Sequence, residues 1–211
     1  IDARGFDKDG AGVGKSPNPM NGPIFVEGAE PGDALRVEIV AMRPIRDTGW
    51  TLSVLAPNVV DPDILRTPPE AKKTTWHIDR NALTTRLAEP PKGLEDFVLP
   101  LTPMIGCFGV APASGEAIST MTSGRHGGNM DYRRFGPGTI VWLPVGAPGA
   151  LFYLGDCHAV QGDGEIVVRR PLHRHVSLQL GRQVADDVLP HHQLVVAGGI
   201  HEVVALAVLV Q

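Results

Sequence analysis

The sequence predicts a mainly β fold, a β-sandwich or jelly-roll-like domain with few short helices, on the basis of three observations. Its 211 residues include 25 glycines and 19 prolines, which break the chain into many short segments. Leu35, Val37 and Ile39 alternate with other residues, as in a strand with one buried face. Short apolar runs such as 151–154 end in turn residues, and a 43% hydrophobic content allows a sizeable core.

Residues 1–21 contain glycines and prolines without an apolar period, so we expect an irregular arm there and a single β domain over 22–211. An apolar run at 24–26 leads into Glu30-Pro31-Gly32-Asp33. Pro31 and Gly32 suit the two central positions of a type II turn. The alternating strand at 35–39 follows that turn.

Residues 43–100 are polar and rich in proline, and we expect them to form a long surface excursion rather than a core element. Inside this range we expect a short strand at 76–79, with Trp50 and Trp76 anchoring the excursion on the core. The glycines of 103–112 indicate strands that closely approach a ligand or another backbone. Further strands are expected at 139–143, after a Gly-Pro-Gly turn, and at 176–180; residues 200–210 suit a buried strand or a helix start.

The densest group of potential metal ligands follows the apolar run at 151–154. Asp156 and His158 are two residues apart, so in extended backbone their side chains point the same way, which is typical of metal ligands. We expect a tight loop that joins this run to a second buried strand at 166–168. A turn without chemistry is the alternative, because Asp and Gly are also common turn residues. The polar residues of this segment are Asp156, His158, Gln161, Asp163 and Glu165.

A second polar cluster, SGRHGGNMD at 123–131, strengthens the metal interpretation because it supplies another His and another Asp. A catalytic zinc site uses three protein ligands and keeps one position open. The preferred ligands are therefore Asp131, Asp156 and His158, with His126 next. An imidazole among the ligands favours zinc, and calcium is the alternative ion.

Other reactive side chains are less favoured as site residues. His77 has no partner at ligand spacing, and His173 and His175 lie among arginines, so surface roles are preferred for all three. Cys107 and Cys157 are interpreted as small buried residues rather than nucleophiles. No serine lies in a nucleophile-elbow pattern, which leaves an α/β-hydrolase triad unsupported.

Four segments together resemble the acetamidase/formamidase family: GPIFVEGAEPGD at 22–33, PMIGCFGVAP at 103–112, HGGNMD at 126–131 and GALFYLGDCHAVQGDGE at 149–165. The resemblance implies hydrolysis of short aliphatic amides to a carboxylate and ammonia, on a mostly β fold, in a homo-oligomer. Family members usually carry sequence before this point. A chain that begins with Ile1 is therefore expected to be truncated, processed or incompletely represented.

For such a reaction we expect a metal-activated water as the nucleophile, with Glu165 or Glu27 moving a proton from this water to the leaving amine. Asn129 and Gln161 are expected to hydrogen-bond the substrate amide. Three alternatives stay open: a covalent route through one of the two cysteines, a non-catalytic calcium-binding β domain, and an inactive partial family member.

The charge of the chain bears on its partners. A formal net charge of −4 without a lysine-rich run gives no electrostatic case for binding nucleic acid or an anionic membrane. No apolar stretch reaches transmembrane length and the start does not resemble an export signal, so a cytoplasmic location is expected. The expected ligand is a small amide.

Overall fold

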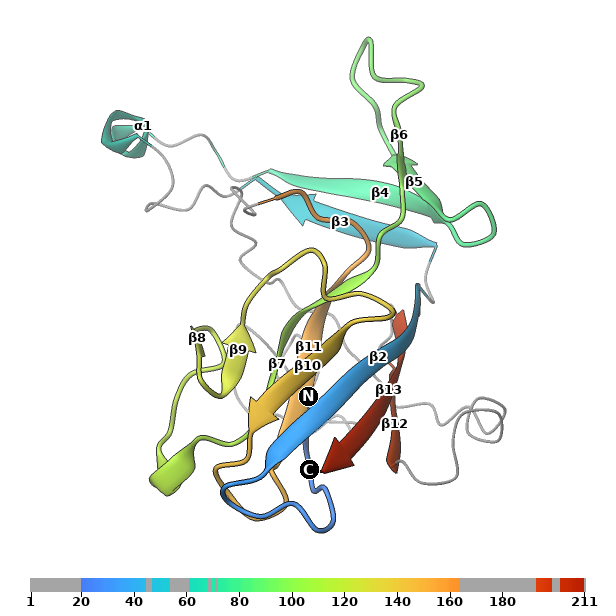
Figure 1. Cartoon of the computed structure of the whole chain (residues 1–211). Helices are drawn as coiled ribbons and strands as arrows, with labels where there is room; N and C mark the ends of the chain where they lie inside the picture. Colours follow the sequence, from blue (N-terminus) through green and yellow to red (C-terminus); the bar gives the residue numbers. More distant parts are fainter. Residues whose placement is uncertain are drawn as a thin grey trace, which may run out of the picture.

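The computed structural model describes residues 20–44, 47–53, 61–67, 70, 72–163, 193–198 and 202–210, the last two ranges by their backbone alone. The regular secondary structure of this part of the chain is almost entirely three antiparallel sheets, which confirms the mainly β prediction (Figure 1). Its helical structure consists of α1, Pro62–Arg66, and a 3-10 turn at Ala113–Gly115. Neither is long and apolar enough to cross a membrane.

Two of the sheets pack against each other as a sandwich. One has five strands in the order β1-β11-β7-β9-β8, and the other has four in the order β10-β2-β13-β12. The five strands of the first sheet are β1 (Met20–Ile24), β7 (Met104–Gly109), β8 (Ser123–Gly124), β9 (Gly127–Asn129) and β11 (Phe152–His158). The four of the second are β2 (Ala34–Pro44), β10 (Ile140–Pro144), β12 (Gln193–Gly198) and β13 (Glu202–Val210).

The core of the described residues lies between these two sheets. From β2 it receives Leu35, Val37 and Ile39, each at most 1% exposed, which confirms the predicted alternation. Phe108 of β7 and Phe152 of β11 pack into the same cluster from the other sheet. Side chains from both sheets thus share one core, as in a sandwich.

Both predicted turns are confirmed by their main-chain geometry. The Asp33 N–H donates to the carbonyl of Glu30 at 3.0 Å, and Gly32 has a φ of 105°, as a type II turn requires at its third position. The Thr139 N–H donates to the carbonyl of Gly136 at 3.1 Å, and β10 begins one residue later. These turns fix where β2 and β10 enter the sheet.

Residues 43–100 contain a third sheet, which the sequence did not predict. Its order is β3-β4-β5-β6, with bounds Thr48–Leu52, Lys73–Asp79, Thr84–Leu87 and Val98–Pro100. The expected strand at 76–79 is the end of β4. The expectation that Trp50 and Trp76 anchor this range on the core is wrong, because neither belongs to the core cluster. Instead, the Trp76 indole N–H donates to the Thr51 hydroxyl at 3.0 Å, and the Lys73 ammonium lies 5.7 Å from the centre of the Trp50 ring.

Several expectations concern residues at the two ends of the chain. Within the apolar segment 200–210, residues Glu202–Val210 form strand β13, which pairs with β2 and β12. The expected strands at 166–168 and 176–180, the histidines 173 and 175, and the first 19 residues of the expected arm lie outside the described residues.

Candidate metal centre

Strand β11 carries two of the three side chains of the candidate site. Its Phe152 and Leu154 are fully buried in the core, and His158 at its end is 1% exposed. Asp156 lies between Leu154 and His158, and its φ of 53° interrupts the extended backbone of β11 at this residue. Asp156 and His158 therefore lie within a strand and not in the expected loop, because β11 continues past the apolar run.

Asp131 follows β9, which lies on the other side of β7 from β11, and its side chain reaches the end of β11 from there. The main-chain N–H groups of Met130 and Asp131 both donate to the carbonyl of Gly106 at 3.0 Å, so the chain turns over β7 directly after β9. The Asn129 amide donates to one carboxylate oxygen of Asp131 at 2.5 Å, and the Gln161 amide donates to the main-chain carbonyl of Asp131. These bonds orient both the backbone and the carboxylate of Asp131.

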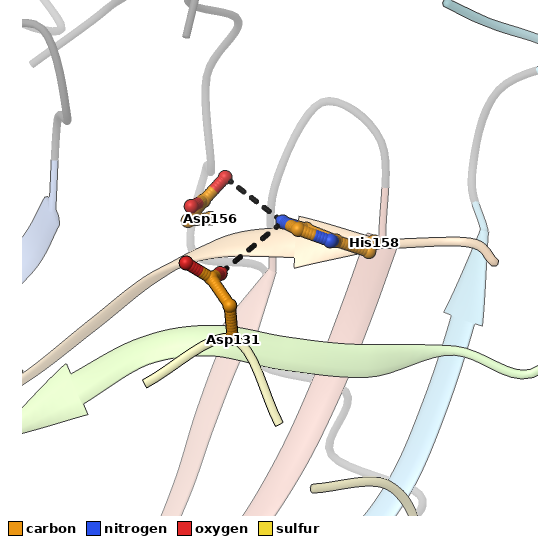
Figure 2. A group of neighbouring side chains, drawn as sticks. All are labelled: Asp131, Asp156 and His158. Carbon is orange, nitrogen blue, oxygen red and sulfur yellow. Dashed lines mark ion pairs between the residues drawn. The ribbon is translucent and has the colours of Figure 1, made fainter. Parts of the chain in front are cut away.

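The three predicted ligands meet at one ring nitrogen. The Nε2 atom of His158 lies 3.3 Å from Oδ1 of Asp156 and 3.8 Å from Oδ1 of Asp131. Figure 2 shows both carboxylates directed towards this nitrogen. One ligand atom from each residue lies within 4.8 Å of the others, so the group has the size of a metal centre.

The burial of His158 distinguishes this group from a surface ion pair. The side chain is 1% exposed, and neither ring nitrogen has a hydrogen-bond partner among the described residues. A buried imidazole without a partner is costly unless another ligand satisfies it. The donor set of one imidazole and two carboxylates fits a divalent ion, and the imidazole favours zinc or a similar transition metal over calcium.

Gly106 provides the space in which these side chains meet. A Cβ atom on this residue would lie 2.5 Å from Oδ1 of Asp131, 2.8 Å from the carbonyl oxygen of Asp156 and 3.1 Å from Nε2 of His158. The close approach that the glycines of 103–112 predicted therefore occurs at this site. Sequence analysis did not assign Gly106 to the site, although a glycine in the fully buried run Met104–Gly109 was a signal for it.

His126, the fourth ligand candidate, is not part of this group. It is 7% exposed, and its Nε2 atom has no hydrogen-bond partner. The ring lies against the hairpin formed by β8 and β9, because a Cβ atom on Gly124 or Gly128 would come within 3.1 Å of it.

The two glutamates proposed for proton transfer are not brought together with the three ligands among the described residues. Glu27 is exposed and follows Val26, whose N–H donates to the carbonyl of Gly149. That contact lies before the start of β11, whereas His158 lies at its end. Glu165 lies outside the described residues. Asp163, two residues earlier, forms an exposed ion pair with Arg133.

Cys107 and Cys157 do not form a disulfide. Cys107 is fully buried, and its thiol donates to the carbonyl of Thr120 at 3.3 Å. Cys157 falls between Asp156 and His158 and so has the opposite strand parity. Neither belongs to the group of potential metal ligands in the described residues.

A comparison with protein families gives a match to the family described as "Acetamidase/Formamidase family" over residues 15–116 and 113–173. An acetamidase of Mycolicibacterium smegmatis is 29% identical over 70% of this chain and 48% of its own length. A formamidase of Methylophilus methylotrophus is 27% identical over 70% of this chain and 46% of its own length. The chain thus spans about half the length of these relatives.

Solved structures that resemble this chain are also described as acetamidases or formamidases. The crystal structure of an acetamidase from Bacillus halodurans is similar with a TM-score of 0.66 and 31% sequence identity, covering 92% of this chain and 52% of that one. A predicted acetamidase/formamidase from Thermoanaerobacter tengcongensis has a TM-score of 0.64 and 32% identity, covering 92% of this chain and 50% of that one.

Proposed function

The chain belongs to the acetamidase/formamidase family, and on this premise we propose that it hydrolyses the C–N bond of short aliphatic amides to a carboxylate and ammonia. The observation that carries the proposal is the convergence of Asp131, Asp156 and His158 on one point above Gly106. The likeness to proteins named acetamidase and formamidase supports the class of substrate.

Asp131, Asp156 and His158 would hold the metal, zinc in the first instance. When bound, a divalent ion supplies Lewis acidity, which polarises an amide carbonyl and lowers the pKa of water. Elements of the protein itself position these three side chains. Asn129 and Gln161 donate hydrogen bonds to Asp131, and Asp156 and His158 belong to strand β11.

Gln161 is the best candidate for binding the substrate amide. Its amide nitrogen donates to the carbonyl of Asp131, while its Oε1 atom is buried and has no hydrogen-bond partner in the part of the chain that the structure describes. That oxygen is an acceptor for the N–H group of a primary amide. Asn129 orients the Asp131 carboxylate by its hydrogen bond. We assign proton transfer to Glu165 ahead of Glu27, because Glu27 is exposed near the opposite end of β11.

The test is ammonia release from formamide and acetamide by the purified chain, as prepared, after chelation, and after zinc is added back. We expect chelation to abolish the activity and zinc to restore it. Asp156→Ala and His158→Ala should each lower kcat/KM by at least about a hundredfold. Asp163→Ala is the matched control, because this carboxylate lies on the same segment but is 80% exposed and paired with Arg133.

Other outcomes separate the alternatives. Activity that survives chelation would exclude the metal and direct attention to the two cysteines. An absence of activity under all three conditions would contradict the proposal and favour a non-catalytic β domain or an inactive partial family member. We also propose that the chain forms a homo-oligomer, as the family resemblance implies, and sedimentation velocity would measure its mass.

A further inference from the structure

A cleft with a volume of about 1270 Å³ lies between the third sheet and the sandwich. Strands β4 and β5 contribute one wall, and the end of β2 contributes the other. Pro103, next to the start of β7, also lines the cleft. None of the three candidate metal ligands does, so the cleft is a separate feature from the metal centre.

The charged groups that line the cleft are mainly basic. The lining residues include three arginines, one histidine and two aspartates. These side chains are Arg43, Arg80, Arg86, His77, Asp47 and Asp79. The excess of positive charge contrasts with the formal net charge of −4 of the whole chain.

Contacts within the protein already engage both carboxylates of the cleft. Asp47 forms an ion pair with Arg80 at 2.9 Å. Asp79 accepts the main-chain N–H groups of Asn81 and Ala82 at 2.9 and 2.8 Å, and these bonds hold the pKa of Asp79 below its usual value. The carboxylates of Asp47 and Asp79 therefore already have partners within the protein.

Arg43 and Arg86, by contrast, have no carboxylate within ion-pair distance among the described residues. Arg86 of β5 also stands directly opposite His77 of β4 in the antiparallel ladder. A bound anion would give Arg43 an ion-pair partner, and it would give Arg86 a closer partner than Asp79, on whose carboxyl Arg86 acts from beyond ion-pair distance.

We propose that this cleft binds a small oxyanion, a carboxylate or a phosphate, between Arg43 on one wall and His77 and Arg86 on the other. The planar guanidinium group donates two parallel N–H bonds to either kind of anion. Arg43 comes from the sandwich and Arg86 from the third sheet, so the anion bridges these two parts of the molecule.

The test is isothermal titration of the whole chain with succinate and, separately, with inorganic phosphate, at low ionic strength and with a chelator present. We expect at least one of the two anions to bind with 1:1 stoichiometry. Arg43→Gln and Arg86→Gln should each weaken binding about tenfold or more. Binding of succinate alone or of phosphate alone would identify which anion the cleft accepts.

Arg66→Gln is the matched control, because this guanidinium is 81% exposed on α1 and pairs only with Asp63 among the described residues. The control should bind as the unchanged chain does. The proposal is overturned if neither anion binds, or if Arg66→Gln weakens binding as much as the cleft variants, because binding would then reflect surface charge alone. The chelator keeps this test independent of amide hydrolysis.

Discussion

Gly106 is the residue on which the geometry of the candidate metal centre depends most directly. Its φ lies outside the left-handed region, so an alanine there is disfavoured by crowding alone. The added Cβ would lie 2.5 Å from Oδ1 of Asp131 and 3.1 Å from Nε2 of His158, which forces at least one ligand to move. We expect Gly106→Ala to weaken zinc binding at least about tenfold, since misplaced ligands lose metal affinity. Equilibrium dialysis with zinc quantification measures this affinity.

The control for this variant is Gly162→Ala. Gly162 is also close to the site in sequence, beside Gln161, but nothing lies within 4 Å of the Cβ that alanine would add. It should retain normal zinc affinity. Normal affinity in Gly106→Ala as well would show that the ion, if any, binds elsewhere.

Tyr153 presents a different residue-scale question, because its buried hydroxyl has no hydrogen-bond partner among the residues that the structure describes. Burial, and to a lesser extent the neighbouring Cys107, raises the pKa of Tyr153 from 10.0 to about 12. Between pH 10 and 12 the unfolded chain releases this proton while the folded chain keeps it, so the stability falls as pH rises. After allowance for solvent screening, Tyr153 should account for a loss of about 1 kcal/mol at pH 11.

Urea unfolding at pH 9 and pH 11 checks this linkage in the unchanged chain and in Tyr153→Phe. The variant lacks the ionisable group and should lose about 1 kcal/mol less between the two pH values. At pH 9 its stability should stay within about 1 kcal/mol of the unchanged chain, because the lost hydroxyl made no hydrogen bond. Identical pH dependence in both proteins would contradict the raised pKa.

At the scale of single elements, β2 and the third sheet show what sequence can and cannot predict. β2 was predictable because one of its faces is buried, which imposes a strict two-residue period on Leu35, Val37 and Ile39. β4 has a similar alternation of exposure, but its inner face is only half-buried and includes Thr74 beside Trp76. A sheet outside the main core places a weaker constraint on residue type, so its strands were interpreted as a surface excursion.

The third sheet should therefore unfold locally before the sandwich does. Thr51→Val removes the hydroxyl that accepts the Trp76 indole N–H at 3.0 Å, with little change in shape. We expect a loss of about 1 kcal/mol in the local stability of β3 and β4. Hydrogen exchange should show faster exchange of their amides while those of β7 and β11 are unchanged. Equal acceleration in the sandwich would mean that the two parts unfold together.

At the scale of the whole molecule, the candidate site depends on strand order, which the sequence does not reveal. Asp156 and His158 do converge, but the φ of 53° at Asp156 departs from the extended backbone on which the spacing argument was based. Their meeting with Asp131 requires β7 to lie between β9 and β11 in the sheet. Residue type alone ranked His126 as a similar candidate, but it lies in the turn between β8 and β9, which leaves its ring against the glycines of that hairpin.

An ion at this site would therefore link segments that only the folded sheet brings together. Asp131 follows β9, while Asp156 and His158 belong to β11, so the unfolded chain does not hold the three ligands in place. Binding to the folded state alone stabilises it by about 2.7 kcal/mol at a free zinc concentration a hundred times the Kd. For a domain of this size we expect a rise in Tm of roughly 5–10 °C.

Differential scanning calorimetry with zinc, with calcium and with chelator measures this rise. Asp156→Asn is the control, because it removes a charged ligand but keeps the size of the side chain, and its Tm should respond much less to zinc. A Tm raised by calcium but not by zinc would support the calcium-binding β domain instead, since calcium prefers an all-oxygen ligand set. If neither ion changes the Tm, the metal centre is excluded. His158 would then be a buried imidazole with two carboxylates as its neighbours and no ion between them.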